Sequence, residues 1–340
     1  MFARCPETYK PLEPGQTTTY NGNPLLPGWE DCVTHCVVMA GARASGKSLY
    51  LAVLIKQLEL MALQRFTRVT IKAADESTRQ RYKENYERPL YEEMKHMAPT
   101  PTSANVDAYQ RDPFIFKLGK WPDANNDLRE HYLVIRDVAG EDLENPNLDP
   151  NSMEFFRYAD LVIFLFDPTR VRSIAPYLEG MYARQSQTGG EPERVLDNIA
   201  RLIGDERPKL AVTIAKFDIL QSLAKKSVQD NKWKSIMANE GAAFSRDTGW
   251  SYQYHNQWIL HLEIQSLLRK FEAHELLNTI EELYANEPSK YSYFAVSALG
   301  EAPKGQDLDR KGIAPYRVLD PVRWHLGRFG VLMGKEDTYQ

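Results

Sequence analysis

The clearest chemical signature in this sequence is the run from Gly41 to Ser48, which reads GARASGKS and fills every fixed position of G-x-x-x-x-G-K-S/T. Glycine lets a backbone turn tightly, so that several N–H groups can point at one spot. Lys47 adds a positive charge for β- and γ-phosphates, and Ser48 adds a hydroxyl that can bind Mg²⁺. The pattern predicts binding of a nucleoside triphosphate, although a short match can also arise by chance around an ordinary turn.

The flanking residues favour the phosphate loop over the ordinary turn. Residues 33–39 are mostly apolar and β-branched, as in a buried parallel strand, and residues 49–60 contain no helix breaker. A helix that begins at Lys47 would direct its positive end at the phosphates. The loop residues that we expect to bind the nucleotide are Gly41, Ala44, Ser45, Gly46, Lys47, Ser48 and Leu49.

Three later motifs also follow strand-like runs. They are DVAG at 137–140, AKFD at 215–218 and SAL at 297–299. The strand-like runs before them cover 131–136, 209–214 and 291–296; further strand-like runs cover 114–118 and 161–166. Because open α/β folds collect ligands at the carboxyl ends of their strands, we expect these motifs to lie near the phosphate loop.

The order of these four motifs resembles that of Ras-like P-loop GTPases. The long spacers, the APTPT segment at 98–102 and the segment 314–321 resemble, more narrowly, the bacterial double-GTPase group. We therefore expect a doubly wound, mostly parallel, six-stranded α/β sheet of the P-loop, G-domain-like kind, with a helical insertion. The resemblance implies GTP or GDP and Mg²⁺ as ligands.

By this resemblance, Asp137 and Ser48 hold the Mg²⁺ ion, and the backbone N–H of Gly140 contacts the γ-phosphate. An aspartate that only caps a turn is the alternative for Asp137. A third metal ligand is expected within 74–113, where Thr102 is preferred to Thr100, although a plain proline-rich loop is also possible. Residues 74–97 have apolar residues at helical spacing, which predicts a helix that packs on the domain.

Asp218 is predicted to select the base, because a carboxylate can accept from both the ring N–H and the amine of guanine. Lys216 belongs to the same motif, and the backbone of Ser297, Ala298 and Leu299 is expected to contact the guanine oxygen. The family carries Asn or Thr where this chain has Ala215, which puts affinity in doubt. In the alternative interpretation, Lys216 and Asp218 are a solvated strand end.

The candidate catalytic residues are Glu141, Lys47 and Arg43. Glu141 stands where Ras-like enzymes often have a glutamine that positions water, but its negative charge near a polyphosphate is costly. Asp142 is a secondary candidate of the same kind. Arg43 can either clamp the transferring phosphate in cis or point outward as a loop charge. Slow hydrolysis is therefore expected.

Composition bounds the remaining possibilities. The chain has 340 residues, 43% of them hydrophobic, and a net charge of −4, which gives no electrostatic reason to expect nucleic acid. No signal peptide and no membrane span are apparent, so we expect a soluble cytoplasmic protein. Cys5, Cys32 and Cys36 could form a zinc site with His35, but buried free thiols suit the expected strand better.

The layout predicts an irregular N-terminal arm at 1–32, a GTPase-like P-loop domain at 33–330 and a C-terminal tail at 331–340, frayed from Gly334. The domain would include the long switch I region at about 74–113, a helical insertion at about 221–290 and a last helix from Pro315 to Leu326. Most of the insertion is expected to be core, and the remainder a docking face for another protein.

These observations favour a bacterial GTP-binding molecular switch, a slow hydrolase that signals to a protein effector or regulator through residues 98–113 and 141–158. Two alternatives remain. One is a catalytically weak nucleotide-binding interaction module, and the other is an ATP-using P-loop enzyme.

Overall fold

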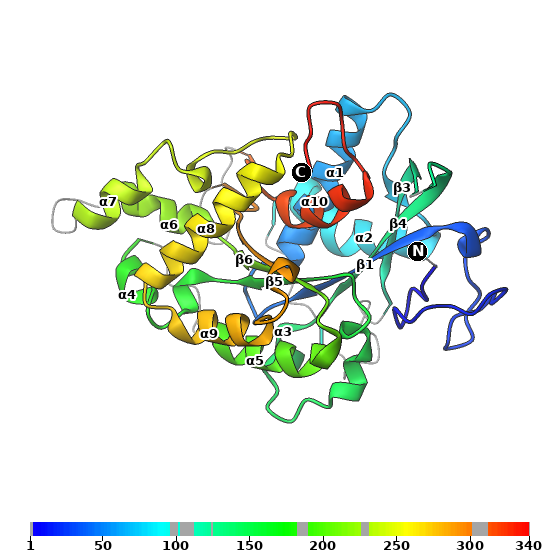
Figure 1. The fold of residues 1–340 in the computed structure, drawn as a ribbon, viewed down its shortest axis with the longest axis horizontal. Helices are drawn as coiled ribbons and strands as arrows, with labels where there is room; N and C mark the ends of the chain where they lie inside the picture. The colour runs from blue at the N-terminus through cyan, green and yellow to red at the C-terminus, as the bar shows by residue number, and fades with distance from the viewer. Residues whose placement is uncertain are drawn as a thin grey trace.

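The structure is a computed structural model that describes residues 3–95, 101–102, 112–123, 125–181, 190–225, 231–300 and 312–339. Within these ranges the chain forms a sheet with helices on both faces (Figure 1). The strands are β1 (Val33–Ala40), β2 (Lys72–Ala73), β3 (Phe114–Pro122), β4 (Leu128–Asp137), β5 (Leu161–Phe166), β6 (Lys209–Ile214) and β7 (Tyr291–Ala295).

The strand order is β2-β3-β4-β1-β5-β6-β7. The five strands from β4 to β7 in this order are parallel, whereas β3 is antiparallel to β4 and β2 is antiparallel to β3. This confirms the predicted doubly wound, mostly parallel α/β fold. The predicted count of six strands is wrong, because the described sheet has seven. The missed strand, β2, has only two residues, which is too short for a periodic pattern.

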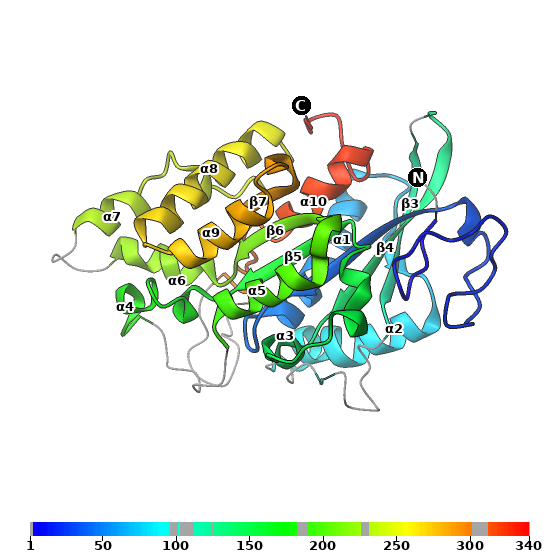
Figure 2. The same ribbon diagram turned by 60° about the horizontal axis from the view of Figure 1, so that its bottom comes forward.

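Both faces of the sheet are covered, and β1 shows how. All eight residues of β1 are buried, and those from Cys36 to Ala40 alternate between two hydrophobic clusters. Val38 and Ala40 lie on the face covered by α5 (Pro192–Ile203) and α9 (His274–Leu283) (Figure 2). Val37 and Met39 lie on the opposite face. There, α1 (Lys47–Arg65) and α10 (Asp320–Leu326) pack. A strand buried on both faces reads as a continuous apolar run, which is why it was visible in the sequence.

The remaining helices are mostly short. They are α2 (Glu76–Tyr82), α3 (Gly140–Glu144), α4 (Ala175–Leu178), α6 (Phe217–Gln221), α7 (Asn231–Met237) and α8 (Tyr254–Lys270). The predicted packing helix at 74–97 forms as α2 followed by a π-helix, η2 (Lys83–Glu92), which buries Tyr86 and Leu90. The residues after Asp218 include the helices α7, α8 and α9, of which α8 and α9 lie beside β7 (Figure 2).

The chain ends are held by specific contacts. The Tyr9 hydroxyl, fully buried, donates to the carbonyl oxygens of Val37 and Val134 at 3.0 and 3.2 Å. At the other end, the predicted frayed tail is wrong. Thr338 exchanges backbone hydrogen bonds with Tyr252 and Tyr254, each 2.9 Å long. The reason is Asp337, whose carboxylate binds Arg323 and anchors the segment.

The last helix also begins later than predicted, at Asp320 rather than Pro315. Backbone hydrogen bonds of 3.0 and 2.7 Å pair Ser297 with Tyr316 in a β-bridge, and residues 317–319 then form a bend and a turn before α10. The sequence pattern could not reveal this pairing, because the two partners are distant in the chain.

Cys5, Cys32 and Cys36 are buried free thiols. Burial raises the pKa of Cys32 to about 12, so this thiol is kept protonated and unreactive. Among the described residues, no three His, Cys, Asp or Glu side chains are grouped so as to hold a metal ion. Across the same residues, none of the helices has both the length and the apolar character needed to span a bilayer.

His35 has two histidine neighbours instead. Its Nδ1 lies 3.0 Å from Nε2 of His325, and its Nε2 lies 2.9 Å from Nδ1 of His131. All three side chains are buried, and His35, in the middle of the row, lies near the amino end of β1, whereas the phosphate loop follows the carboxyl end. Burial lowers the pKa of all three, to about 4 for His131 and about 3 for His325. The imidazoles are therefore neutral at physiological pH.

Candidate functional site

The predicted site motifs lie at one edge of the sheet. Gly41 follows β1, Asp137 ends β4, Ala215 follows β6 and Ser297 follows β7, and these four strands run parallel. In addition, β1 lies between β4 and β5, so the connections on its two sides run in opposite directions. Open α/β sheets form their binding crevice at such a position, outside the carboxyl ends of the strands. The topology therefore brings motifs far apart in sequence to one place.

The loop between β1 and α1 has the backbone that its glycines predict. Gly46 has a φ of 97° and precedes α1 directly, and Ala44 also has a positive φ, 60°. Gly41 has a φ of 149°, and a Cβ atom there would lie 2.1 Å from the carbonyl oxygen of Leu165. Only glycine fits at this position, because the clash would be with rigid backbone.

Lys47 lies at the centre of the loop. Its Nζ donates to the carbonyl oxygens of Gly41 and Ala42 at 2.8 and 3.0 Å, and its side chain is buried. Burial lowers the pKa of Lys47 to about 8, against the opposing effect of Asp137 and Glu144. A buried ammonium group held by carbonyls, rather than by a dedicated carboxylate, suits a site that receives an anion.

Ser48 and Asp137 fit a magnesium ion. The Ser48 hydroxyl donates to Oδ2 of Asp137 at 2.8 Å, although the residues are 89 positions apart. Asp137 is only 3% exposed, and its Oδ1 has no hydrogen-bond partner among the described residues. Burial raises the pKa of Asp137 above its usual value. Lys47 and the hydrogen bonds from Ser48 and Tyr86 offset only part of this rise. Mg²⁺ prefers oxygen ligands of this kind, so the donor set present here fits the ion.

The D-x-x-G motif packs directly on the phosphate loop. A Cβ atom at Gly140 would lie 2.2 Å from the backbone nitrogen of Arg43, so this contact also requires glycine. Oε1 of Glu144 accepts a hydrogen bond of 2.6 Å from the same nitrogen. The first turn of α3 is thus in close contact with the phosphate loop, and we call this contact, between Gly140–Glu144 and Arg43, the seam.

Arg43 and Glu141, both predicted as catalytic, form an ion pair across this seam. Nη1 of Arg43 lies 2.7 Å from Oε1 of Glu141, and the two side chains are 41% and 42% exposed. The guanidinium group of Arg43 therefore offsets the negative charge of Glu141. Without this compensation, a carboxylate close to a polyphosphate would be unfavourable.

On the base side, Lys216 ties the loop after β6 to the phosphate loop. Its Nζ donates to the carbonyl oxygen of Ala44 at 3.2 Å and to Oδ2 of Asp167 at 2.6 Å. Lys216 thereby connects the loop after β6 with the phosphate loop, a connection that the apolar side chain of Ala215 cannot make through a hydrogen bond. Asp167 was missed in the sequence; its only signal is its place directly after the buried strand β5.

Asp218 and Ser297 also meet. The Ser297 hydroxyl donates to Oδ1 of Asp218 at 2.6 Å and accepts from the backbone N–H of Gly300 at 2.9 Å. Asp218 is half-buried. Burial raises its pKa above the usual value, and the hydrogen bond from Ser297 offsets only part of this rise. Ala298 and Leu299 follow as half-buried residues. The carboxylate predicted to read the base is thus oriented by the SAL motif.

The predicted metal ligand in switch I is not brought to the site by any contact that the structure gives. Thr102 is half-buried in a loop, and Thr100 lies outside the described residues. A different residue of this region, Tyr86, reaches the site: its hydroxyl donates to Oδ2 of Asp137 at 2.9 Å. The sequence predicts only a packing role for Tyr86, because helical spacing signals burial and not a polar contact.

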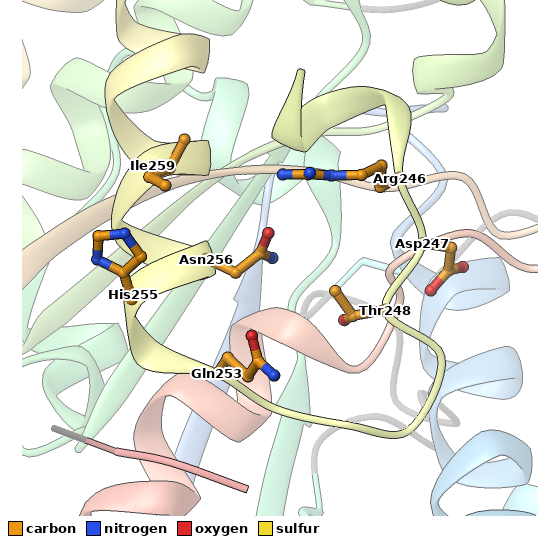
Figure 3. Close-up of a pocket in the computed structure, with 7 residues that line it drawn as sticks. All are labelled: Arg246, Asp247, Thr248, Gln253, His255, Asn256 and Ile259. Carbon is orange, nitrogen blue, oxygen red and sulfur yellow. The ribbon is translucent and has the colours of Figure 1, made fainter. Parts of the chain in front are cut away.

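An open hollow lies between the segment before α8 and the first turns of this helix (Figure 3). It is lined by Arg246, Asp247, Thr248, Gln253, His255, Asn256 and Ile259. Asp247 already serves the fold, since its Oδ2 accepts from the backbone N–H of Arg317 at 3.1 Å. This hollow contains none of the predicted site residues.

The phosphate loop, the adjoining D-x-x-G motif and the sheet order define a P-loop, GTPase-like α/β fold. No protein-family model matches the sequence. The chain is 41% identical, over 310 residues, to a protein of Mycolicibacterium smegmatis, the "Putative ESX-1 scaffolding and assembly protein SaeC". The match covers 91% of this chain and 78% of that protein, so the chain belongs to the SaeC family.

Solved structures show only distant likeness. The Ski7 GTPase-like domain of S. cerevisiae, bound to GTP, is 11% identical with a TM-score of 0.30, covering 82% of this chain and 49% of that one. Sup35 complexed with GMPPNP is 12% identical with a TM-score of 0.29, covering 78% and 37%. This chain thus spans about a third to a half of these two chains. Likeness at this level identifies neither ligand nor activity.

Proposed function

We propose that this chain is a GTP-binding regulatory switch with slow Mg²⁺-dependent GTP hydrolysis that acts on protein partners in the bacterial cytoplasm. The observation that carries the proposal is the arrangement of Lys47, Ser48, Asp137 and Gly140 around one loop. The name of its M. smegmatis relative, a scaffolding and assembly protein, supports a role among protein partners. The finer resemblance to the bacterial double-GTPase group rests on the sequence segments alone.

In this proposal, Lys47 and the loop amides bind the phosphates, while Ser48 and Asp137, with Thr102, hold the metal. Bound Mg²⁺ neutralises charge on the phosphates. Asp218 accepts from the two N–H donors of guanine, a pair that adenine does not offer, and Lys216 and Ser297 fix the loops around it.

Glu141 is the proposed water-positioning residue, since it follows Gly140 at the seam with the phosphate loop. Its ion pair with Arg43 must open before its carboxylate can turn toward the phosphates. That requirement supports slow turnover until a partner rearranges α3. The proposed partner surfaces remain 98–113 and 141–158; much of the first lies outside the described residues.

The second candidate is a nucleotide-holding module that does not turn over. The Arg43–Glu141 pair and Ala215 favour it, because both depart from an efficient GTPase site. Phosphate release under excess GTP separates the two functions. Absence of release, both alone and with the protein partners present, would favour the module.

Lys47→Ala is expected to lower GDP and GTP affinity about 10- to 100-fold, because charge-assisted hydrogen bonds contribute roughly 1.5–3 kcal/mol. Fluorescent nucleotide titration measures the change. Lys56→Ala is the matched control: this lysine lies on the same helix, but its ammonium group pairs with Glu59 and Glu87. Unchanged affinity in Lys47→Ala would reject the phosphate-loop assignment.

Asp218→Asn is expected to weaken GDP binding by about 10- to 100-fold and to leave ADP binding unchanged, since a charged acceptor for two N–H groups is lost. Competitive titration with both nucleotides gives the ratio. Asp205→Asn, a change at an exposed residue before β6, should leave the ratio as it is. Tighter binding of ADP than GDP by the unmodified chain would instead indicate an ATP-using protein.

A further inference from the structure

We propose that Tyr86 is a positioning residue for the magnesium site, which holds the Asp137 carboxylate in its metal-binding orientation and couples the helical segment 76–92 to the metal. This inference rests on the proposed function, because it concerns the same ion. It adds a residue that neither the phosphate-loop pattern nor the D-x-x-G pattern contains.

Hydrogen bonds to Asp137 fix the orientation of its carboxylate. Two hydroxyl groups donate to one carboxylate oxygen, Oδ2: that of Tyr86 at 2.9 Å and that of Ser48 at 2.8 Å. The other oxygen, Oδ1, is buried and has no hydrogen-bond partner among the described residues. Two donors on one oxygen fix the rotation of a carboxylate, and they leave the second oxygen available to an ion or to a water molecule bound by the ion.

Tyr86 is held in place by burial and by the aromatic rings around it. Its side chain is fully buried, its ring is stacked on Tyr82 with centroids 5.9 Å apart, and Phe114 meets it edge-on at 5.2 Å. A hydroxyl held in this way cannot follow the carboxylate if the carboxylate turns. Partners of this kind outside the ligand shell typically change metal affinity 10- to 100-fold when they are removed.

The position of Tyr86 in the chain connects the helical segment 76–92 to the metal site. It lies in the π-helix Lys83–Glu92, which also contains Pro89, and π-helical turns are frequent at functional sites. This helix lies within the region 74–113 that was predicted as switch I. A shift of the helix must therefore break the Tyr86–Asp137 bond, and a metal ion that requires this orientation of Asp137 must in turn favour the position of the helix.

Tyr82 provides the comparison for a purely structural role. It is equally part of the aromatic cluster, but its hydroxyl donates to the backbone carbonyl oxygen of Ala52 at 3.0 Å. Tyr82→Phe thus removes the same atom, from the same cluster, without a contact to Asp137. A general loosening of the cluster would appear in both variants, whereas loss of metal positioning would appear only in Tyr86→Phe.

The test measures GDP affinity of the full chain as a function of Mg²⁺ concentration, and again in EDTA. Tyr86→Phe is expected to raise the half-maximal Mg²⁺ concentration about 10-fold and to leave the affinity in EDTA unchanged. Tyr82→Phe should alter neither. Hydrogen exchange gives a readout independent of turnover: Mg²⁺ with GDP should slow exchange at 83–92 in the unmodified chain but not in Tyr86→Phe.

An unchanged Mg²⁺ dependence in Tyr86→Phe, or an equal shift in both variants, would overturn the inference while leaving the proposed function intact. The affinity in EDTA shows that each variant is folded around the phosphate loop. Failure of the unmodified chain to bind guanine nucleotide at any Mg²⁺ concentration would instead reject the proposed function, and this inference with it.

Discussion

Asp337→Ala is expected to lower the free energy of unfolding by about 3–5 kcal/mol, because it leaves a buried arginine without its partner. Nη2 of Arg323 lies 2.7 Å from Oδ2 of Asp337; the two side chains are 2% and 0% exposed. The same carboxylate pairs with Arg65 at 2.9 Å and accepts backbone bonds from Tyr252 and Gly334 at 2.6 and 2.8 Å. A residue close to the end of the chain therefore fastens α1, α10 and the segment before α8.

Urea or thermal unfolding measures this effect. Glu336→Ala is the matched control, since its side chain is 62% exposed and pairs with Arg65 at the surface. Exposed pairs contribute about 0–1 kcal/mol, so this variant should remain close to the unmodified chain. Equal losses in the two variants would show that the C-terminal segment is not anchored through Asp337.

Stability should also fall as the pH decreases below about 6.5, because three buried histidines are neutral in the folded chain. Burial lowers the pKa of His35, His131 and His325 in the folded state, whereas in the unfolded chain they take up protons near pH 6.5. The unfolded state therefore binds more protons below this pH, and each histidine contributes up to about 1.4 kcal/mol of lost stability per pH unit. The loss continues to about pH 4 for His131.

The free energy of unfolding, measured between pH 7 and 5, gives the slope. His131→Gln should make the slope shallower by up to about 1.4 kcal/mol per pH unit, even if the variant is less stable at neutral pH. His255→Gln, a change at an exposed histidine on α8, should leave the slope unchanged. His261 is buried as well, with its pKa lowered to about 4, and adds to the slope that remains. An unchanged slope in His131→Gln would contradict the assignment of a neutral imidazole to this residue.

The core of the sheet was predictable because its strands are buried on both faces. β5 is an uninterrupted apolar run and β1 and β6 are mostly apolar, and the predicted and observed strands agree closely. The phosphate loop was predictable for a different reason: its residues are contiguous, and their backbone demands glycine at Gly41 and Gly46. Local sequence suffices where local geometry sets the requirement.

The limits of the sequence appear where the partners are distant in the chain. The two-residue strand β2 exists only through its pairing with β3, and α10 begins late because Tyr316 is bridged to Ser297. The expectation of a frayed tail failed for the same reason, since Asp337 is anchored by Arg65 and Arg323. The predicted boundaries of the N-terminal arm and of the helical insertion remain predictions.

The sequence by itself determined the fold class, the phosphate loop and the order of the motifs around it, because each depends on residue types at short spacing. Only the tertiary structure decided which groups meet. It paired Arg43 with Glu141, gave Lys216 the partner Asp167, joined His35 to two other histidines and directed Tyr86 at Asp137. Such contacts depend on how separate elements pack, and a side chain's spacing in the sequence does not specify its partner across the fold.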